Sequence, residues 1–287
     1  MNINTTTTKD FEWTPEAISD FWDDVSNEPR LNQLYFTKFN GRHISRLCSL
    51  VDTDAKILDY GSGPGYLTRN LLDDGFMTAA LDFSPKSVQS LETQFKDRPN
   101  WLGGTHVSDP PCDLKSEEFD TVITCETYEH LLDEWIPGYF QEIRRLLRPG
   151  GHMILTTPCQ EDLSLSFNIC PKCHTHFHKW GHLRSVDPDV LRNEVQSAGF
   201  DVKFCQGINL RDLGNHTVDD TTTGKTDRVA YRGRRFQVLR SFARVLGLSD
   251  FESMFRPEFK KHEVHTFDDL FSLTPGEHLV LIATRNS

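Results

Sequence analysis

Three glycines at alternate positions form the stretch best suited to bind a ligand. Residues 56–67 read Lys-Ile-Leu-Asp-Tyr-Gly-Ser-Gly-Pro-Gly-Tyr-Leu, an apolar strand pattern that leads through Gly61, Gly63 and Gly65 into a helical pattern. Glycine lets the backbone take positive φ and lets a ligand come close, and the following helix offers free N–H groups. The pattern predicts a loop that wraps a ligand, with a plain strand-to-helix turn as the alternative. The spacing differs from the G-x-G-x-x-G of dinucleotide-binding loops.

Acidic side chains end other predicted strands. Asp82 ends the second strand, where an acidic group accepts hydrogen bonds from the ribose hydroxyls of a nucleotide ligand. The alternative is that Asp82 caps the next helix, a role that Ser84 already fills. The groups that end the third and fourth strands are Asp109, Cys125 and Glu126. Since parallel strands bring their carboxyl ends to one edge, we expect these groups and Asp59 to face one crevice.

Strand and helix patterns alternate along the chain and set the fold class. Strands are expected at 56–60, 78–82, 101–109, 119–124, 152–157, 200–205 and 278–284. Helices are expected over 14–50, 65–74, 127–147 and 187–198. This alternation predicts an α/β fold with a doubly wound, Rossmann-like and mostly parallel sheet.

The composition is that of a folded acidic protein. The chain has 287 residues, of which 37% are hydrophobic and 25% charged, so it can build a substantial core. Its net charge of -11 argues against a general nucleic-acid binder. The first ten residues lack the apolar core of a signal peptide, and no run of about 18 apolar residues could span a membrane. Seven cysteines, mostly scattered, favour a reducing, cytoplasmic setting.

Four ordered segments resemble the motifs of class I S-adenosylmethionine-dependent methyltransferases of the small-molecule branch. The glycine loop at 57–65 is similar to their first motif, and Leu-Asp-Phe-Ser-Pro at 81–85 is similar to their acidic second-strand motif. Residues 119–131 resemble their fourth-strand motif, and 145–151 match the helix and turn before the fifth strand. The resemblance implies that the last strand of the sheet, 278–284, is reversed.

The resemblance also implies roles for residues around the loop. The implied cofactor-binding residues are Asp59, Gly61, Ser62, Gly63, Gly65, Asp82, Phe83, Ser84, Asp109, Pro110, Cys125 and Glu126. The loop would wrap the methionine part of S-adenosylmethionine, with Asp59 near its amino group. Asp82 would bind the ribose hydroxyls, and Phe83 would lie beside the adenine. Cys125 and Glu126 would line the floor near the sulfonium.

A proton acceptor is the remaining requirement for methyl transfer to a hydroxyl or ammonium group. A nearby His, Asp or Glu can take the proton and typically contributes about 10²–10⁴-fold in rate. His130 follows the fourth strand and is the first candidate for a catalytic base. The alternative is a structural residue that hydrogen-bonds to the backbone at the start of a helix.

Residues 170–182 form an insert that is rich in Cys and His. The spacing of a tetrahedral structural zinc site is matched by Cys170, Cys173, His178 and His182, with His174 and His176 as alternative ligands. Other interpretations are a loop with free thiols and exposed histidines, a redox pair, or a catalytic role for His178 or His182.

Two further segments are expected to select the acceptor. Residues 209–277 separate the last two strands and predict a substrate-binding cap, in which Arg234 and Arg235 could bind an anionic substrate. The alternative is an ordinary helix with a solvated arginine face. Residues 1–50 predict a helical lid over the glycine loop, in which Tyr35 or Phe36 touches a ligand, or else a helical layer packed on the sheet. The cofactor-binding domain would comprise 51–208 and 278–287.

The sequence therefore predicts a cytoplasmic methyltransferase that acts on a small-molecule acceptor, most plausibly at a hydroxyl oxygen. Nitrogen and carbon acceptors stay open, as does the oligomeric state. One alternative is a nicotinamide-dependent Rossmann oxidoreductase, which the loop spacing disfavours. Another is a non-catalytic, cofactor-binding interaction module.

Overall fold

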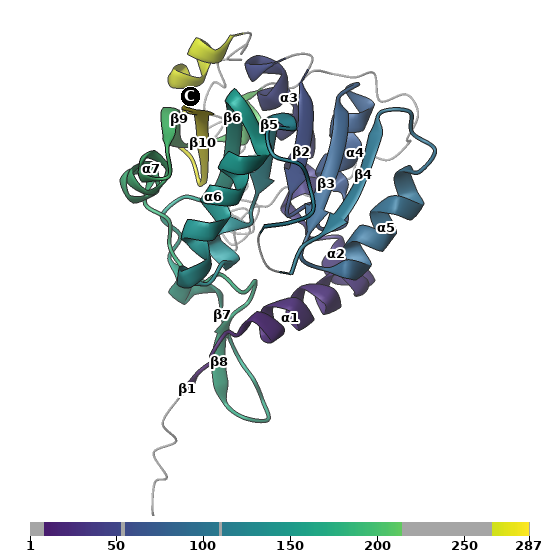
Figure 1. The fold of residues 1–287 in the computed structure, drawn as a ribbon. Helices are drawn as coiled ribbons and strands as arrows, with labels where there is room; N and C mark the ends of the chain where they lie inside the picture. Colours follow the sequence, from purple (N-terminus) through teal and green to yellow (C-terminus); the bar gives the residue numbers. More distant parts are fainter. Residues whose placement is uncertain (1–8, 53–54, 109–110, 214–265, 287) are drawn as a thin grey trace, which may run out of the picture.

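A seven-stranded sheet forms the centre of the computed structural model, which describes residues 9–52, 55–108, 111–213 and 266–286 (Figure 1). Its strands are β2 (Lys56–Tyr60), β3 (Met77–Asp82), β4 (Trp101–His106), β5 (Phe119–Cys125), β6 (Leu147–Pro158), β9 (Phe200–Ile208) and β10 (His278–Arg285). The order is β4-β3-β2-β5-β6-β10-β9. All neighbours are parallel except those of β10, which runs antiparallel to β6 and β9. The predicted sheet with a reversed last strand is confirmed.

Helices cover both faces of this sheet. They are α3 (Phe36–Val51), α4 (Tyr66–Asp73), α5 (Pro85–Phe95), α6 (Ile136–Leu146) and α7 (Pro188–Ser197). Ile57 of β2 joins the core under α3 and α4, where it packs in one cluster with Ile44. Its neighbour Leu58 joins the core under α6 and α7, with Phe140 and Leu191. Successive side chains of a strand point to opposite faces, so this apolar pair anchors both layers.

The register of the central strands brings the candidate groups to one edge. Tyr60, at the end of β2, lies opposite Leu81 of β3 and Thr124 of β5. Cys125 lies opposite Thr156 of β6. The glycine loop, the end of β3 and the loop after β5 therefore start at one level, at the carboxyl edge of the sheet.

The segment after β5 differs from its prediction as one helix over 127–147. It forms two 3₁₀ turns, η1 (Tyr128–His130) and η2 (Asp133–Trp135), before α6 begins. Glu126 has a φ of 50°, which the α-helix does not allow, and Pro137 lies in the first turn of α6. The two short turns hold the side chains that follow β5 at the carboxyl edge.

Several strands differ in length from their predictions; β9, for example, continues to Ile208 instead of ending at 205, and two further differences have a clear cause. The strand predicted at 101–109 ends at His106, because its partner β3 ends at Asp82, which lies opposite His106. The strand predicted at 152–157 already begins at Leu147, which pairs with Phe119 of β5. Pairing partners, which a single segment does not reveal, set both ends.

The N-terminal segment predicted as helical over 14–50 is three helices. These are α1 (Pro15–Asn27), α2 (Pro29–Asn32) and α3. Proline favours the first turn of a helix, and Pro29 begins a new one directly after α1. Figure 1 shows α1 running along the carboxyl edge of the sheet, whereas α3 packs on its face with Leu47 fully buried. The lid prediction therefore concerns α1 and α2.

A second, three-stranded sheet was not predicted from the sequence. It consists of β1 (Lys9–Asp10), β7 (Phe167–Ile169) and β8 (Thr175–His178), in the order β1-β8-β7, after the short turn η3 (Leu163–Ser166). This small sheet stands apart from the main one (Figure 1). Because β1 pairs with β8, the segment before α1 is tied to the Cys/His insert.

The two ends of the predicted cap belong to the core. Short turns, η4 (Leu210–Leu213) and η5 (Phe267–Ser272), bury Leu210, Leu213 and Leu270 in the cluster that contains α3. The middle of the cap, 214–265, lies outside the described residues. Among the helices of the described part, none is long and apolar enough to cross a membrane.

Candidate active site

The glycine loop has the backbone that only glycine adopts readily. Gly61, Gly63 and Gly65 have φ values of 81°, 51° and 83°. A Cβ at Gly61 would lie 2.4 Å from Thr127 Oγ1, and one at Gly65 would lie 2.2 Å from Leu91 Cδ2. Both the conformation and the close neighbours therefore require glycine at these positions.

Asp82 joins this loop to the end of β3. Its Oδ2 accepts a hydrogen bond from the Gly63 N–H at 2.7 Å, and its Oδ1 accepts one from the Ser84 N–H at 2.8 Å. The side chain is buried, and desolvation raises its pKa. Ser84 caps α5 through a bond from the Ser87 N–H, so Asp82 is not needed as a helix cap. Each carboxylate oxygen keeps a second lone pair with which it can accept a bond from a ligand hydroxyl.

Ser62 places an unpaired hydroxyl in the loop. The residue is 4% exposed, and its Oγ has no hydrogen-bond partner among the described residues. An unsatisfied buried polar group costs about 1–3 kcal/mol. A polar group of a ligand held in the loop would remove this cost, so the loop fits a ligand with polar atoms.

Asp59 points into the fold. Its carboxylate is 1% exposed, and its Oδ2 accepts a bond from Thr68 Oγ1 of α4 at 2.6 Å. Burial raises the pKa of Asp59 to about 7, against the lowering effect of the Thr68 hydroxyl. Asp59 thus links β2 to α4 directly behind the glycine loop.

Cys125 and Glu126 form the end of β5 beside β6. The Cys125 Sγ lies 3.0 Å from Thr156 Oγ1, and Thr156 Oγ1 lies 3.1 Å from Glu126 Oε1. Desolvation raises the pKa of both side chains well above their usual values. Because the Glu126 backbone also has positive φ, this turn is held in an uncommon conformation at the edge of the site.

The N-terminal helices cover the loop from the other side. Asp23 of α1 accepts a bond from Ser84 Oγ at 2.5 Å and pairs with Lys86 Nζ at 2.8 Å. Tyr35 lies against the loop, since a Cβ on Gly63 would be 3.0 Å from its ring. The Tyr35 hydroxyl is 3.0 Å from Ser26 Oγ, and burial raises its pKa. The structure therefore brings the Tyr35 ring to the glycine loop, and its contact with a ligand stays a prediction.

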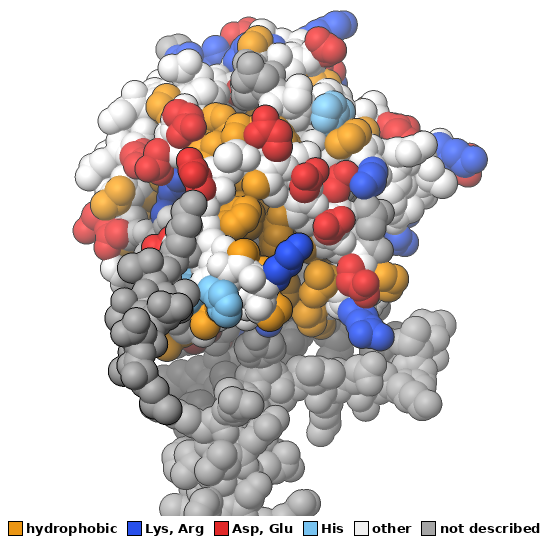
Figure 2. Space-filling view, turned by 90° about the horizontal axis from the view of Figure 1, so that it is seen from below, with side chains coloured by type: hydrophobic (Ala, Val, Ile, Leu, Met, Phe, Trp, Pro, Cys, Tyr) orange, Lys and Arg blue, Asp and Glu red, His pale blue; other side chains and the backbone are white. Residues whose placement is uncertain are grey.

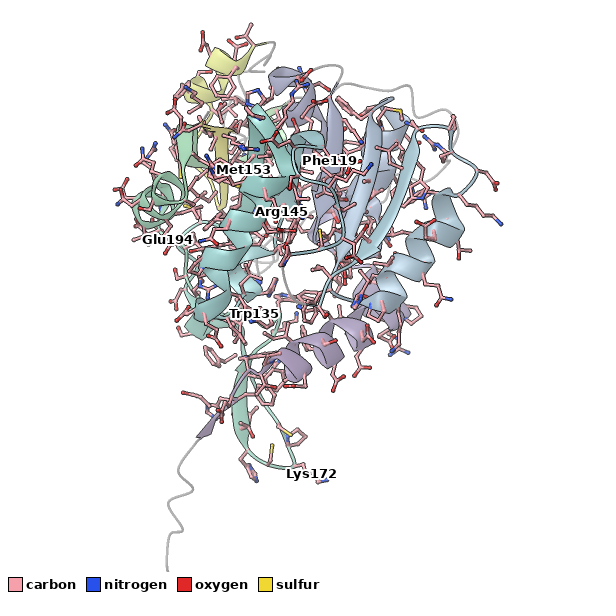
Figure 3. The ribbon with its side chains drawn as sticks, viewed as in Figure 1. Phe119, Trp135, Arg145, Met153, Lys172 and Glu194 are labelled. Atoms are coloured by element: carbon pink, nitrogen blue, oxygen red, sulfur yellow. The ribbon has the colours of Figure 1, made fainter. Side chains whose placement is uncertain are left out.

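Aromatic rings line the remaining side of the crevice. Trp22 of α1 has its ring centroid 4.7 Å from that of His130 and 6.1 Å from that of Tyr35. Phe83, which follows β3, has its ring 5.7 Å from that of Trp135. Figure 3 shows Trp135 between the ends of the central strands and α1. These rings are inclined to one another and offer apolar surface near the loop and the end of β3.

Five ionisable side chains gather beside Trp22. His130 Nδ1 lies 3.2 Å from the Gly181 carbonyl oxygen, and His130 Nε2 lies 3.8 Å from Glu129 Oε1. His182 Nδ1 lies 2.5 Å from Glu161 Oε2, and the His182 ring stacks on that of His178 at 4.4 Å. Desolvation lowers the pKa of His130 well below its usual value. We refer to Glu129, His130, Glu161, His178 and His182 as the His/Glu cluster.

The predicted zinc site is not assembled. Cys170 and Cys173 flank Lys172 at the tip of the β7–β8 hairpin, far from the sheet (Figure 3). Within the described residues, the two groups suited to a metal are Glu129-His130-His182 and Glu161-His178-His182, and neither contains a cysteine. The described residues do not bring Cys170, Cys173, His178 and His182 together as one ligand set, so the zinc prediction gains no support from the structure.

Sequence reasoning missed four residues near the site and named four that cannot be placed. The missed residues are Trp22, Glu129, Trp135 and Glu161. Glu129 could have been found from its place beside His130 after a buried strand, whereas Trp22 and Glu161 gave no local signal. The residues outside the described part are Asp109, Pro110, Arg234 and Arg235.

Comparison with known proteins adds a family match. Residues 32–203 match the family model described as a methyltransferase domain. The chain is 26% identical over 168 residues to the mitochondrial ubiquinone biosynthesis O-methyltransferase of Homo sapiens, an alignment that covers 53% of this chain and 43% of the relative. It is 25% identical over 155 residues to the ubiquinone biosynthesis O-methyltransferase of Cereibacter sphaeroides, covering 51% and 60%. The chain thus spans about half the length of these curated relatives.

Solved structures share the fold over nearly the whole chain. The Burkholderia thailandensis 1,6-didemethyltoxoflavin-N1-methyltransferase, solved with bound 1,6-didemethyltoxoflavin and S-adenosylhomocysteine, superposes with a TM-score of 0.56 at 15% identity, covering 100% of this chain and 99% of that one. A S-adenosylmethionine-dependent methyltransferase from Clostridium acetobutylicum gives a TM-score of 0.52 at 13% identity, covering 93% and 99%. At such identities the likeness concerns the fold.

Proposed function

The chain belongs to the class I methyltransferase-domain family, and we propose that it transfers the methyl group of S-adenosylmethionine to a hydroxyl oxygen of a small molecule. The observation that carries the proposal is the glycine loop, with three positive φ values, a buried unpaired Ser62 hydroxyl and the Asp82 carboxylate at its edge. Loop and carboxylate follow adjacent parallel strands, at the edge where such sheets bind ligands.

The described residues fit S-adenosylmethionine. The backbone of Gly61 and Gly63 would lie against the methionine part, and the Ser62 hydroxyl would find a hydrogen-bond partner there. Asp82 would accept bonds from the ribose hydroxyls, and Phe83 and Ser84 would lie next to the adenosine. Asp59 would support the loop from behind through Thr68. The bound cofactor would supply an electrophilic methyl group on a positively charged sulfur.

The acceptor is proposed to bind between α1 and the loop after β5. Trp22 and Tyr35 provide rings there, with His130 packed on Trp22, and Trp135 provides one beside Phe83. Figure 2 views the molecule from the side of this edge and shows apolar side chains gathered at its centre, with acidic side chains around them. Such a surface suits a small, largely apolar acceptor. The curated relatives are named O-methyltransferases, which supports oxygen as the acceptor atom.

The side chains around the acceptor would act mainly by aligning the acceptor oxygen with the methyl group of the cofactor. Holding two reacting groups in line can contribute about 7–11 kcal/mol to catalysis. The acceptor hydroxyl must also lose its proton, and the His130 ring, which packs on Trp22, lies with its Nε2 3.8 Å from Glu129 Oε1. His130 offers Nε2 for this purpose, since its Nδ1 faces a carbonyl oxygen. The N-terminal helices would exclude water from the crevice.

An anionic group on the acceptor is a further part of the proposal. Its support is the run of arginines in the sequence that includes Arg234 and Arg235, in a chain of net charge -11. Changing both to Ala is expected to raise the KM for the acceptor about 10–100-fold, the cost of one or two charge-assisted bonds, with an unchanged Kd for S-adenosylhomocysteine. Arg98→Ala, which removes an exposed pair with Asp73, is the control. Equal KM values for all three proteins would refute the anionic acceptor.

Methyl transfer is tested with S-adenosylmethionine that carries a deuterated methyl group. The protein is incubated with a panel of phenols, hydroxylated aromatic acids and primary amines, and products are measured by mass spectrometry. We expect a labelled product from a hydroxylated acceptor together with equimolar S-adenosylhomocysteine. Hydride transfer with NAD⁺ or NADP⁺ on the same panel, without any labelled product, would support the oxidoreductase alternative.

A further inference from the structure

The His/Glu cluster contains a buried carboxylate oxygen that accepts no hydrogen bond from the described residues. Glu129 is 1% exposed, and its Oε2 accepts a bond from Thr157 Oγ1 at 2.9 Å. Its Oε1 is fully buried and has no hydrogen-bond donor among the described residues. A buried carboxylate oxygen without a donor or cation is costly. A positively charged ligand at this position would remove that cost.

His130 and His182 each have a ring nitrogen lone pair available near Glu129. The Gly181 carbonyl oxygen can only accept a hydrogen bond, so His130 Nδ1 must carry the proton and Nε2 keeps the lone pair. His182 Nδ1 donates in the same way to Glu161 Oε2, which leaves the lone pair on its Nε2. One ligand atom each from Glu129, His130 and His182 lies within 4.8 Å of the other two.

We propose that Glu129, His130 and His182 bind one divalent transition-metal ion beside the acceptor crevice. Two imidazole nitrogens and one carboxylate oxygen form a ligand set that such ions accept, and three protein ligands leave at least one position open. The ion would occupy the space next to the unpaired Glu129 Oε1. Mg²⁺ is disfavoured, since it prefers oxygen ligands.

The surrounding groups orient these ligands as metal sites require. Glu161 holds His182 through Nδ1, and the Gly181 carbonyl holds His130. His178 serves a different purpose, because its Nδ1 accepts a bond from the His182 backbone N–H at 3.1 Å. Its Nε2 then carries the proton and lies 3.5 Å from Glu161 Oε1. The second possible group, Glu161-His178-His182, therefore supports the site and does not form another one.

The position of the ion suggests its use. His130 packs on Trp22, so the open coordination position lies near the proposed acceptor pocket. An acceptor hydroxyl bound to the ion would lose its proton more easily, because a bound cation lowers the pKa of a coordinated oxygen. His130 Nε2 would then hold the ion and would not take the proton itself. This use rests on the proposed methyl transfer, whereas binding of the ion does not.

Calorimetry on untagged full-length protein treated with a chelator tests the site. Mn²⁺ and Zn²⁺ are titrated separately, with Mg²⁺ for comparison, and Mn²⁺ binding is checked by electron paramagnetic resonance. We expect one Mn²⁺ or Zn²⁺ ion per chain. Glu129→Gln and His182→Ala should weaken binding at least 100-fold, and Glu161→Gln, which only orients His182, about 10–100-fold.

Two control variants distinguish metal binding in the His/Glu cluster from metal binding elsewhere on the chain. Cys170→Ser with Cys173→Ser should leave binding unchanged, since these thiols lie at the hairpin tip. His152→Ala removes a half-buried histidine elsewhere and should also have no effect. Glu161 is partly exposed, so Glu161→Gln reports on the site even if the buried variants fail to fold.

Either of two results would overturn the site: no ion bound by the wild-type protein, or binding that is lost in the double Cys variant and kept in Glu161→Gln. Titration of S-adenosylhomocysteine into the metal-free protein keeps the two proposals apart. Loss of metal binding with intact S-adenosylhomocysteine binding would remove only the metal site. Loss of S-adenosylhomocysteine binding with intact metal binding would remove only the methyltransferase proposal.

Discussion

Replacing Asp59 with Asn should change how stability depends on pH. The Asp59 carboxyl is 1% exposed, and desolvation raises its pKa from 3.8 to about 7. Between these values the folded protein holds a proton that the unfolded chain releases. Stability due to this group is therefore lost as pH rises from about 4 to 7.

The size of the effect follows from the shift. One pKa unit corresponds to about 1.36 kcal/mol, so a pKa near 7 makes Asp59 cost roughly 2 kcal/mol more at pH 7 than at pH 5. Asn has nearly the same shape, can accept the bond from Thr68 Oγ1 and does not ionise in this range. The stability of Asp59→Asn relative to the wild type should therefore increase by roughly 2 kcal/mol from pH 5 to pH 7.

Urea unfolding followed by tryptophan fluorescence at pH 5, 6 and 7 measures this difference. Asp73→Asn is a matched control, because Asp73 is 44% exposed and pairs with Arg98 on the surface. The control should keep the pH dependence of the wild type. A stability difference between Asp59→Asn and the wild type that stays constant from pH 5 to pH 7 would refute the reasoning.

Three further substitutions test the loop and its cover. Gly65→Ala should destabilise the protein by about 2–4 kcal/mol in urea unfolding, and by more than Gly75→Ala. Both glycines have positive φ, but only Gly65 has a neighbour within 4 Å of the added Cβ. Equal losses of stability in the two variants would refute the close contact at Gly65. Asp82→Ala should weaken S-adenosylhomocysteine binding about 10–100-fold by calorimetry, since it also frees the Gly63 N–H; an unchanged Kd would exclude Asp82 from the cofactor site. Trp22→Ala should raise the KM for the acceptor while the affinity for the cofactor stays within about twofold of the wild type. If the affinity for the cofactor falls by the same factor as the KM for the acceptor rises, Trp22 belongs to the cofactor site.

Local sequence patterns predicted the sheet and the backbone conformation of the glycine loop well. The apolar pair before Asp59, the glycine spacing and the strand-end Asp82 are all short-range signals, and each depends on only a few neighbouring residues. The parallel sheet then brings these ends together without further information. The predicted ends of strands were less accurate. β6 begins at Leu147 and β4 ends at His106 because of the residues that pair with them on neighbouring strands.

Groups assembled from distant segments could not be predicted in the same way. The zinc prediction relied on spacing alone, which shows neither that Cys170 and Cys173 reach the tip of a hairpin nor that Glu161 meets His182. The segment that carries Trp22 was predicted as a lid or a packed layer. Its contact with His130 depends on the path of α1 along the carboxyl edge, which no local pattern fixes.

Binding of S-adenosylhomocysteine is the most direct test of the central claim that the glycine loop is a cofactor site. Titrations of S-adenosylhomocysteine and of NAD⁺ are carried out by calorimetry on one preparation of the untagged protein. We expect one S-adenosylhomocysteine per chain, with a Kd in the micromolar range, about -8 kcal/mol, and no heat from NAD⁺. Binding of NAD⁺ without binding of S-adenosylhomocysteine would contradict the account.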